Sequence, residues 1–497
     1  MRLPNRLASA PLYFIGCFIF VSAASLAGLL VPIIFYFALF SGAIISLVYL
    51  RHFISRPCAI TPYSVLAVNF SLGYLVGPSV AAWYFLWPHE ISPIFLSGPF
   101  SFDGNVGWFS IAIAFASLAV AVSIFIGEFS DNKLFSNIYR SQADSKLQDA
   151  VFTAAVIILI IIAFLSGDVG YMGVQNFGED SHITILGGLA GTILTALPAI
   201  FVVKAFRQNT KRINNVLYFL LVIIIFFIIS IVGRRYLIYS ILSTAIIMFF
   251  YRPDIERSFH LARLKRLGVA KMVVIFLLGA TLVVGMSYFY ALRIAVWTYG
   301  PEQSISSLVV NGWNIWHTQT YAEYHASAEA KARSGTLPGY LGALMDSDTD
   351  TESLDGTCML HGVLNSTPRL LLFNKNRLLD EYSSCSDLRV NAAAGLPQID
   401  SPITIITQAY VDFGYFGPFL YVIIIGALFG VVPLLIKWNR SPVFSVFAIA
   451  VTLNTLLIAE QGLTFYMVAI RNLIIIFSFS YALMFILDHG SRRRVRE

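Results

Sequence analysis

The chain has 497 residues, of which 57% are hydrophobic and only 12% are charged, and its mean hydropathy is +0.75. Soluble globular domains carry roughly 25% charged residues, so this composition excludes a soluble globule and predicts a membrane protein. The formal net charge is +6. The basic residues form no aromatic-basic patch outside the connecting loops, so we expect no nucleic-acid partner.

Apolar runs of roughly the ~20 residues that a helix needs to cross a bilayer recur along the chain. Backbone groups in hydrocarbon must pair within the segment, so these runs are predicted to be helices of an all-α polytopic membrane protein. We predict about twelve spans, at 11–29, 32–50, 62–86, 108–127, 149–166, 185–203, 216–232, 236–251, 272–291, 415–436, 442–459 and 466–487.

The distribution of basic residues predicts how the chain is oriented. With the N-terminus inside, the inner loops and termini hold 23 of the 33 Lys and Arg residues. Cytoplasmic loops carry the excess of positive charge, so both termini are predicted to be cytoplasmic. The chain then divides into nine spans (1–291), a long outer segment (292–414), and three spans with a cytoplasmic tail (415–497).

The outer segment begins with a predicted helix over 307–332 that carries aromatic side chains at three- and four-residue spacing. Trp313, Trp316, His317 and Tyr324 fall on one side of it. This side either packs on the membrane domain or stacks against the apolar faces of sugar rings. Both interpretations stay open at this point.

The four cysteines divide between two compartments. Cys17 and Cys58 lie in a span and an inner loop, whereas Cys358 and Cys385 lie in the outer segment. An oxidising outer compartment favours joining the outer pair. We therefore predict a Cys358–Cys385 disulfide, and no cluster suggests a metal site or a cofactor.

Four arginines lie in or beside spans on the outward side of the predicted topology. Arg234 and Arg235 form the turn in IVGRRYLIYS, Arg293 follows span nine, and Arg471 lies inside span twelve. A charge at such depth costs at least ~2.5 kcal/mol, so it needs a partner or a function. The arginines either snorkel to headgroups, or Arg471 pairs with Glu460, or the group binds a polyanion through forked guanidinium contacts.

Three passages together resemble bacterial oligosaccharide repeat-unit polymerases, the O-antigen polymerases of the Wzy type, which are related to the O-antigen ligases. They are IVGRRYL (231–237), NSTPRLLLFNKNRLLDEY (365–382) and ITQAYVDFGYFGPFLYVIIIGALFGVV (406–432). The first is similar to a small-residue–Arg turn, the second to a Pro-Arg segment of the long periplasmic loop, and the third to an aromatic–x–Phe-Gly–x–x–Gly span start. Family members often have an acid where this chain has Gln408, and Asn where it has Asp412.

The resemblance implies a GT-C-like, metal-independent glycosyltransferase of the bacterial inner membrane, acting in lipopolysaccharide biosynthesis. The growing glycan on undecaprenyl diphosphate would be transferred to a hydroxyl of an incoming lipid-linked repeat unit, with a separate co-polymerase regulating chain length. Cations would stabilise the charge that develops on the leaving diphosphate. The predicted diphosphate-binding residues are Arg234, Arg235, Arg293, Arg369, Lys375, Arg377 and Arg471.

The candidate bases for the acceptor hydroxyl are Glu460, Asp412 and His317, and the candidate stacking residues are Trp313, Trp316 and Tyr324. Two alternatives remain. An O-antigen ligase would share the architecture and use a loop histidine. A flippase or other transporter would also fit twelve spans and intramembrane arginines, although no internal duplication is visible.

Overall fold

A computed structural model describes 32–55, 60–79, 106–130, 133–135, 146–165, 185–207, 220–226, 234–250, 304–318, 336–347, 355–368, 374–381, 403–439, 441–458 and 461–494, with scattered residues in 11–19, 218–229 and 280–300 and also Leu372. Every regular element in this part of the chain is a helix, as predicted. The chain separates into two compact units. The first comprises Met1–Leu134, Ser327–Val431 and Thr455–Arg471, and the second comprises Phe135–Ala326, Val432–Asn454 and Asn472–Glu497.

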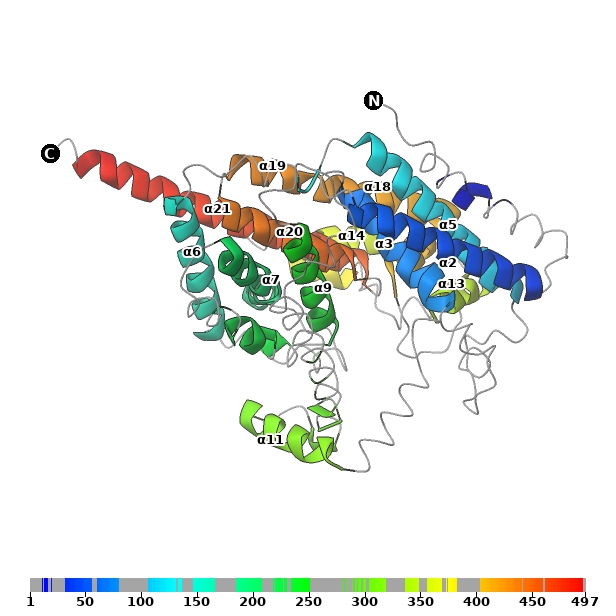
Figure 1. Cartoon of the computed structure of the whole chain (residues 1–497), viewed down its shortest axis with the longest axis horizontal. Coiled ribbons are helices and arrows are strands. Elements are labelled where there is room, and N and C mark those ends of the chain that lie inside the picture. Colours follow the sequence, from blue (N-terminus) through cyan, green and yellow to red (C-terminus); the bar gives the residue numbers. More distant parts are fainter. Residues whose placement is uncertain are drawn as a thin grey trace. The chain divides into compact units, whose positions relative to one another are not determined.

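Helices occupy most of the predicted spans that the structure describes (Figure 1). Their bounds are α2 Pro32–Ser55, α3 Pro62–Ser71, π-helix η2 Leu72–Val76, α5 Val106–Phe129, α6 Lys146–Leu165, α7 Ile185–Arg207, α9 Arg234–Phe250, α18 Gly417–Phe429, α19 Val431–Trp438, α20 Pro442–Leu456 and α21 Leu463–Arg494. The remaining helices lie in the predicted outer segment. They are α11 Ile305–Trp316, α13 Thr336–Ser347, α14 Thr357–Ser366, α15 Lys375–Glu381 and α17 Ile405–Phe413.

Three helical stretches among the described residues are long and apolar enough to cross a membrane. They are Ile111–Phe129, Ile405–Trp438 and Leu463–Ile486. Shorter apolar helices lie at Leu39–Arg51, Leu147–Ala163, Gly188–Lys204, Tyr236–Met248 and Pro442–Leu456. Helix begins at Ile405, inside the predicted outer segment, because a capping box at Thr404 and Thr407 starts α17 ahead of the apolar run.

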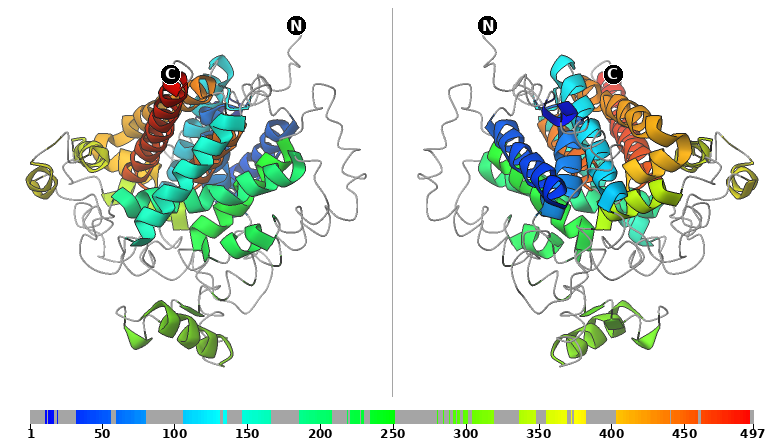
Figure 2. Two further views of the ribbon diagram at one scale, coloured as in Figure 1. Left: turned by 90° about the vertical axis from the view of Figure 1, so that its left-hand side faces the viewer. Right: turned by 90° about the vertical axis from the view of Figure 1, so that its right-hand side faces the viewer.

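The first unit is a bundle in which α3 is central. Thr61 and Ser64 form a reciprocal capping box at its start, and every residue from Pro62 to Ser71 is buried. Helices α2, α5 and α18 pack around α3, and α13 packs on α5. Figures 1 and 2 show α2 and α3 in blue, with α5 in cyan beside them. The bundle is close-packed: a Cβ on Gly426 of α18 would meet the Tyr63 ring at 2.0 Å.

A tight corner joins α17 to α18 through the short 3₁₀ segment η6 (Gly414–Phe416). Gly414 has φ of +57°, a backbone conformation that disfavours residues with a Cβ. Gly417 has no room for a Cβ, which would lie 1.7 Å from the Ala409 carbonyl oxygen. These two glycines belong to the FGYFG stretch, so the structure supplies a steric reason for that pattern.

The second unit contains α6, α7, α9, α11, most of α20 and the later part of α21. Helix α7 packs on α6 and on α9. The Thr195 carbonyl accepts hydrogen bonds from Ser240 of α9 (2.6 Å) and from Asn454 of α20 (3.0 Å). Asp149 accepts one from Ser441 (2.6 Å), so polar side chains join helices that are distant in sequence.

Candidate functional site

One residue of α17, Asp412, holds the first turn of α14. Its Oδ1 accepts the Cys358 N–H at 3.0 Å, and its Oδ2 accepts the Met359 N–H at 2.9 Å and the hydroxyl of Tyr421. Its backbone carbonyl accepts the Gly356 N–H at 3.3 Å. Asp412 is completely buried. A carboxylate at a helix N-terminus both satisfies free N–H groups and complements the helix dipole, so Asp412 functions here as a cap.

Gln408 lies one turn earlier on α17 and holds the start of α21. Its Oε1 accepts the N–H of Leu463, the first residue of α21, at 2.7 Å. Gln408 is almost fully buried, and a Cβ on Gly462 would lie 2.8 Å from that Oε1. The amide oxygen therefore sits directly against the turn that begins the last helix.

The turn between α20 and α21 is also fixed from α3. Asn69 donates from Nδ2 to the carbonyls of Leu456 (2.7 Å) and Ile458 (3.2 Å). The hydroxyl of Tyr466, in α21, donates to the Ile458 carbonyl at 2.7 Å. These bonds satisfy carbonyls at the end of α20, so the start of α21 is fixed on both sides.

Helix α14 packs against the start of α21 (Figure 1). A Cβ on Gly362 of α14 would lie 3.3 Å from the Met467 sulfur and 3.5 Å from the Thr464 backbone nitrogen. Because Gly362 carries only hydrogen, the two helices approach closely. The outer segment is thereby joined to the last predicted span.

Two of the predicted diphosphate-binding cations meet at the end of α14. Lys375 of α15 is buried, and its Nζ donates to the carbonyls of Asn365 (2.7 Å) and Thr367 (2.8 Å). Arg471 of α21 is half-buried, and its Nη1 lies 3.5 Å from the same Asn365 carbonyl. Lys375 and Arg471 lie about a hundred positions apart in the sequence, yet both approach the carbonyl oxygen of Asn365. We call these two residues the Lys375–Arg471 pair.

This geometry suits an anion for electrostatic reasons. An anion bound beside both the ammonium and the guanidinium group would be attracted by both positive charges. Arginine offers a planar fork and lysine a compact point charge, and both are phosphate ligands. The same cations also complement the C-terminal end of the α14 dipole, so helix capping is the competing structural role.

The structure also describes the helices that carry three other predicted cations. Arg377 lies on α15 with its side chain exposed. Arg234 and Arg235 are the first residues of α9, in the second unit. Residues Arg293, Arg369, Glu460, Tyr324 and Cys385 lie outside the described residues, so their assignments stay predictions.

The aromatic helix of the outer segment is shorter than predicted. Helix α11 ends at Trp316 because His317 leaves the helical conformation as its C-cap, and its N-cap is Ser304. Trp316 packs with Tyr288 at a centroid distance of 5.6 Å, whereas Trp313 is 54% exposed. Trp316 therefore contributes to packing, and Trp313 remains the candidate for sugar stacking.

His317 lies beside Trp313, with 4.6 Å between the ring centroids. Its Nδ1 is 2.9 Å from the Trp313 carbonyl oxygen, which accepts only, so Nδ1 carries the proton. In the neutral ring Nε2 is then the acceptor. Helix α11 belongs to the second unit, so this group is described separately from the Lys375–Arg471 pair.

Cys358, at the start of α14, is buried and disulfide-bonded, while its predicted partner Cys385 lies outside the described residues. We expect Cys358→Ser to lower the free energy of unfolding by about 3 kcal/mol, because the bond restricts the unfolded chain. Thermal unfolding with and without reductant measures the effect, and mass spectrometry of non-reduced peptides identifies the partner. Cys17→Ser with Cys58→Ser is the control, and equal loss of stability in that double variant would contradict the assignment.

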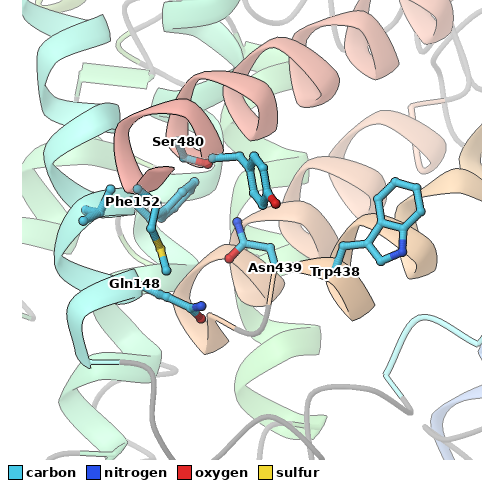
Figure 3. A pocket seen from close by; sticks show the side chains of 8 residues that line it. Gln148, Phe152, Trp438, Asn439 and Ser480 are labelled. Atoms are coloured by element: carbon cyan, nitrogen blue, oxygen red, sulfur yellow. The ribbon is translucent and has the colours of Figure 1, made fainter. Parts of the chain in front are cut away.

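A small cavity in the second unit is not a substrate site (Figure 3). It is lined by Gln148, Phe152, Trp438, Asn439 and Ser480, among others, and holds about 40 Å³. That volume admits water but no sugar ring. The buried Oε1 of Gln148 has no hydrogen-bond partner there, which suits an ordered water. Among the described residues, no group of three or more His, Cys, Asp or Glu is arranged to hold a metal ion.

Sequence reasoning missed Asn365 and the capping role of Gln408. The carbonyl of Asn365 is a backbone atom, so no residue type signals it. In the sequence, Gln408 stands out only as a departure from a family pattern. Its capping role is not visible there because its Oε1 accepts the N–H of a residue 55 positions away. No protein-family model, curated protein or solved structure matches this chain.

Proposed function

We propose that the chain is a membrane glycosyltransferase that polymerises lipid-linked oligosaccharide repeat units on the outer face of the bacterial inner membrane. The observation that carries the proposal is the convergence of Lys375 and Arg471 on the Asn365 carbonyl. It joins the NSTPRLLLFNKNRLLDEY stretch to the last predicted span. Twelve spans, cytoplasmic termini and a GT-C-like arrangement belong to the same proposal.

The proposed reaction needs little from the protein beyond positioning and charge. A hydroxyl of the incoming repeat unit attacks the anomeric carbon of the growing glycan. The new carbon–oxygen bond forms as the bond to undecaprenyl diphosphate breaks, and the electron pair leaves with the diphosphate. Lys375 and Arg471 stabilise the charge that develops on it. The hydroxyl proton goes to a base, for which Glu460 is our candidate, or to the released diphosphate.

Asp412 is better suited to holding the site than to accepting that proton. Both of its carboxylate oxygens already accept hydrogen bonds, and the side chain is buried. A general base needs to lie within hydrogen-bond reach of the substrate proton. We therefore propose Asp412 as a structural residue of the site and retain Glu460 and His317 as candidate bases.

The test is elongation in vitro. Purified protein with a defined undecaprenyl-diphosphate-linked repeat unit is expected to form a ladder of products, resolved by mass spectrometry, without added metal or cofactor. In cells, deletion is expected to leave a single repeat unit attached to lipid A core. Complete loss of surface repeat units would instead indicate a flippase.

A second candidate function is an O-antigen ligase. The observation that favours it is His317, which is exposed on the predicted outer side with Nε2 as acceptor when the ring is neutral. A ligase would transfer long glycan to lipid A core and would not extend undecaprenyl diphosphate-linked chains. The deletion strain would then accumulate lipid-linked polymer and lack modified core, which separates this function from polymerisation.

A further inference from the structure

We propose that Gln408 and Asp412 are a pair of positioning residues that set the geometry of Lys375 and Arg471 by holding the first turns of α21 and α14. This inference rests on the proposed function of the cation pair. Among the described residues, neither side chain hydrogen-bonds Lys375 or Arg471. Each acts through the helix that it caps.

The two caps come from one face of one helix. Residues four apart on an α-helix lie above one another, so Gln408 and Asp412 point in a common direction from α17. Helix α17 is itself anchored, because Thr404 and Thr407 form its capping box and Tyr74 of η2 hydrogen-bonds Thr404. It also packs on α13 and α18. The caps therefore project from a rigid support.

From these caps, α14 and α21 run side by side in the same direction. Close approaches occur first between Gly362 and the Thr464–Met467 stretch, and then between Asn365 and Arg471. Arg471 lies about 12 Å along α21 from Leu463, and Asn365 about 10 Å along α14 from Cys358, at 1.5 Å per residue. Both helices start at α17, and the distances from their first turns to Arg471 and to Asn365 are similar. The parallel helices therefore bring Arg471 and Asn365 together.

The consequence is that the register of the two helices sets the distance between the cations. Losing the Gln408 cap frees the first turn of α21 to shift. Arg471 then moves with α21, while Lys375 of α15 stays bound to the carbonyls at the end of α14. A displacement of about 1 Å at a reacting group lowers rates by about 10²-fold. Affinity for the diphosphate falls for the same reason.

The experiment uses the full chain in detergent and compares Gln408→Leu, Gln408→Glu and Gly462→Ala. Leucine removes the acceptor, glutamate keeps an oxygen acceptor, and an alanine at 462 places a Cβ against Oε1 without changing α17. Thr61→Ala is the matched control, because it removes a helix cap from α3 in the same unit. The measurements are Tm, the Kd for undecaprenyl diphosphate, and kcat and KM for elongation.

We expect Gln408→Leu and Gly462→Ala to lower kcat by about 10²-fold and weaken diphosphate binding by about 10-fold, whereas Gln408→Glu restores most of both. Thr61→Ala is expected to lower Tm comparably while kcat stays within about twofold of wild type. Equal kcat losses for Thr61→Ala and Gln408→Leu at equal Tm would overturn the positioning role, as would a failure of Gln408→Glu to rescue.

The same measurements separate this inference from the proposed function. If Arg471→Ala and Lys375→Ala bind undecaprenyl diphosphate as tightly as wild type, the anion site itself is wrong. If those two variants lose binding while Gln408→Leu behaves like Thr61→Ala, the site stands and only the positioning role is wrong. Diphosphate affinity is measured without turnover, so both outcomes are readable even if elongation is not observed.

Discussion

Replacing Arg471 with alanine is expected to lower kcat for elongation by about 10²–10³-fold, since it removes a cation from the charge that develops on the leaving diphosphate. Lys375→Ala is expected to have a similar effect, because both cations are held on the Asn365 carbonyl. Arg471→Lys keeps the charge and loses the fork, so it should recover only part of the rate. Elongation kinetics and undecaprenyl diphosphate affinity are the measurements.

Lys437→Ala is the matched control for charge, because Lys437 is exposed on α19 on the predicted cytoplasmic side. It is expected to leave kcat unchanged. The competing role of Lys375 and Arg471 is to cap α14, which predicts a loss of at most about 1 kcal/mol per cation in stability. A lower Tm with unchanged diphosphate affinity would therefore assign the pair to capping and remove the main support for the proposed function.

The variant Gly417→Ala is expected to yield little folded protein, with a loss of about 3 kcal/mol or more in the free energy of unfolding. The added Cβ would lie 1.7 Å from the Ala409 carbonyl oxygen and 3.2 Å from the Tyr410 nitrogen. Both atoms belong to the backbone, so no side-chain rotation relieves the overlap. The corner between α17 and α18 would have to open, which moves the Asp412 and Gln408 caps.

Size-exclusion chromatography and thermal unfolding of detergent-purified protein measure this loss. Gly16→Ala is the control, because nothing lies within 4 Å of the Cβ that it adds. We expect its Tm to match wild type. A normal Tm for Gly417→Ala would show that the corner is looser than its close approach indicates.

Much of the secondary structure follows from the sequence for simple physical reasons. Apolar runs of spanning length predict α2, α5, α6, α7, α9 and α21, because a backbone among apolar side chains must satisfy its own hydrogen bonds. Local signals also mark ends, as the Thr404–Thr407 capping box does for α17. The end of α11 at Trp316 was not predicted, because aromatic spacing continues beyond the residue where the backbone leaves the helix.

The candidate site was predictable only in part. The cost of placing a charge inside an apolar segment marks Arg471 as a cation that needs a partner or a function. Lys375 is predicted only from the resemblance of residues 365–382 to the loop segment of the polymerases. Their meeting was not predictable, because it depends on a backbone carbonyl and on the close approach of Gly362 to α21. Asp412 was assigned as a base from its residue type, whereas its hydrogen bonds to Cys358 and Met359 favour a capping role.

Composition and local sequence patterns are enough to predict an all-helical, strongly apolar protein with basic residues concentrated on one predicted side. These properties depend on composition and on residues that are close together in the sequence. Hydropathy and capping patterns can therefore be used to predict them. Which charges lie together is visible only in the folded chain. Contacts such as Gln408 to Leu463 and Lys375 to Asn365 depend on how helices pack, and packing depends on the shapes of side chains far apart in sequence.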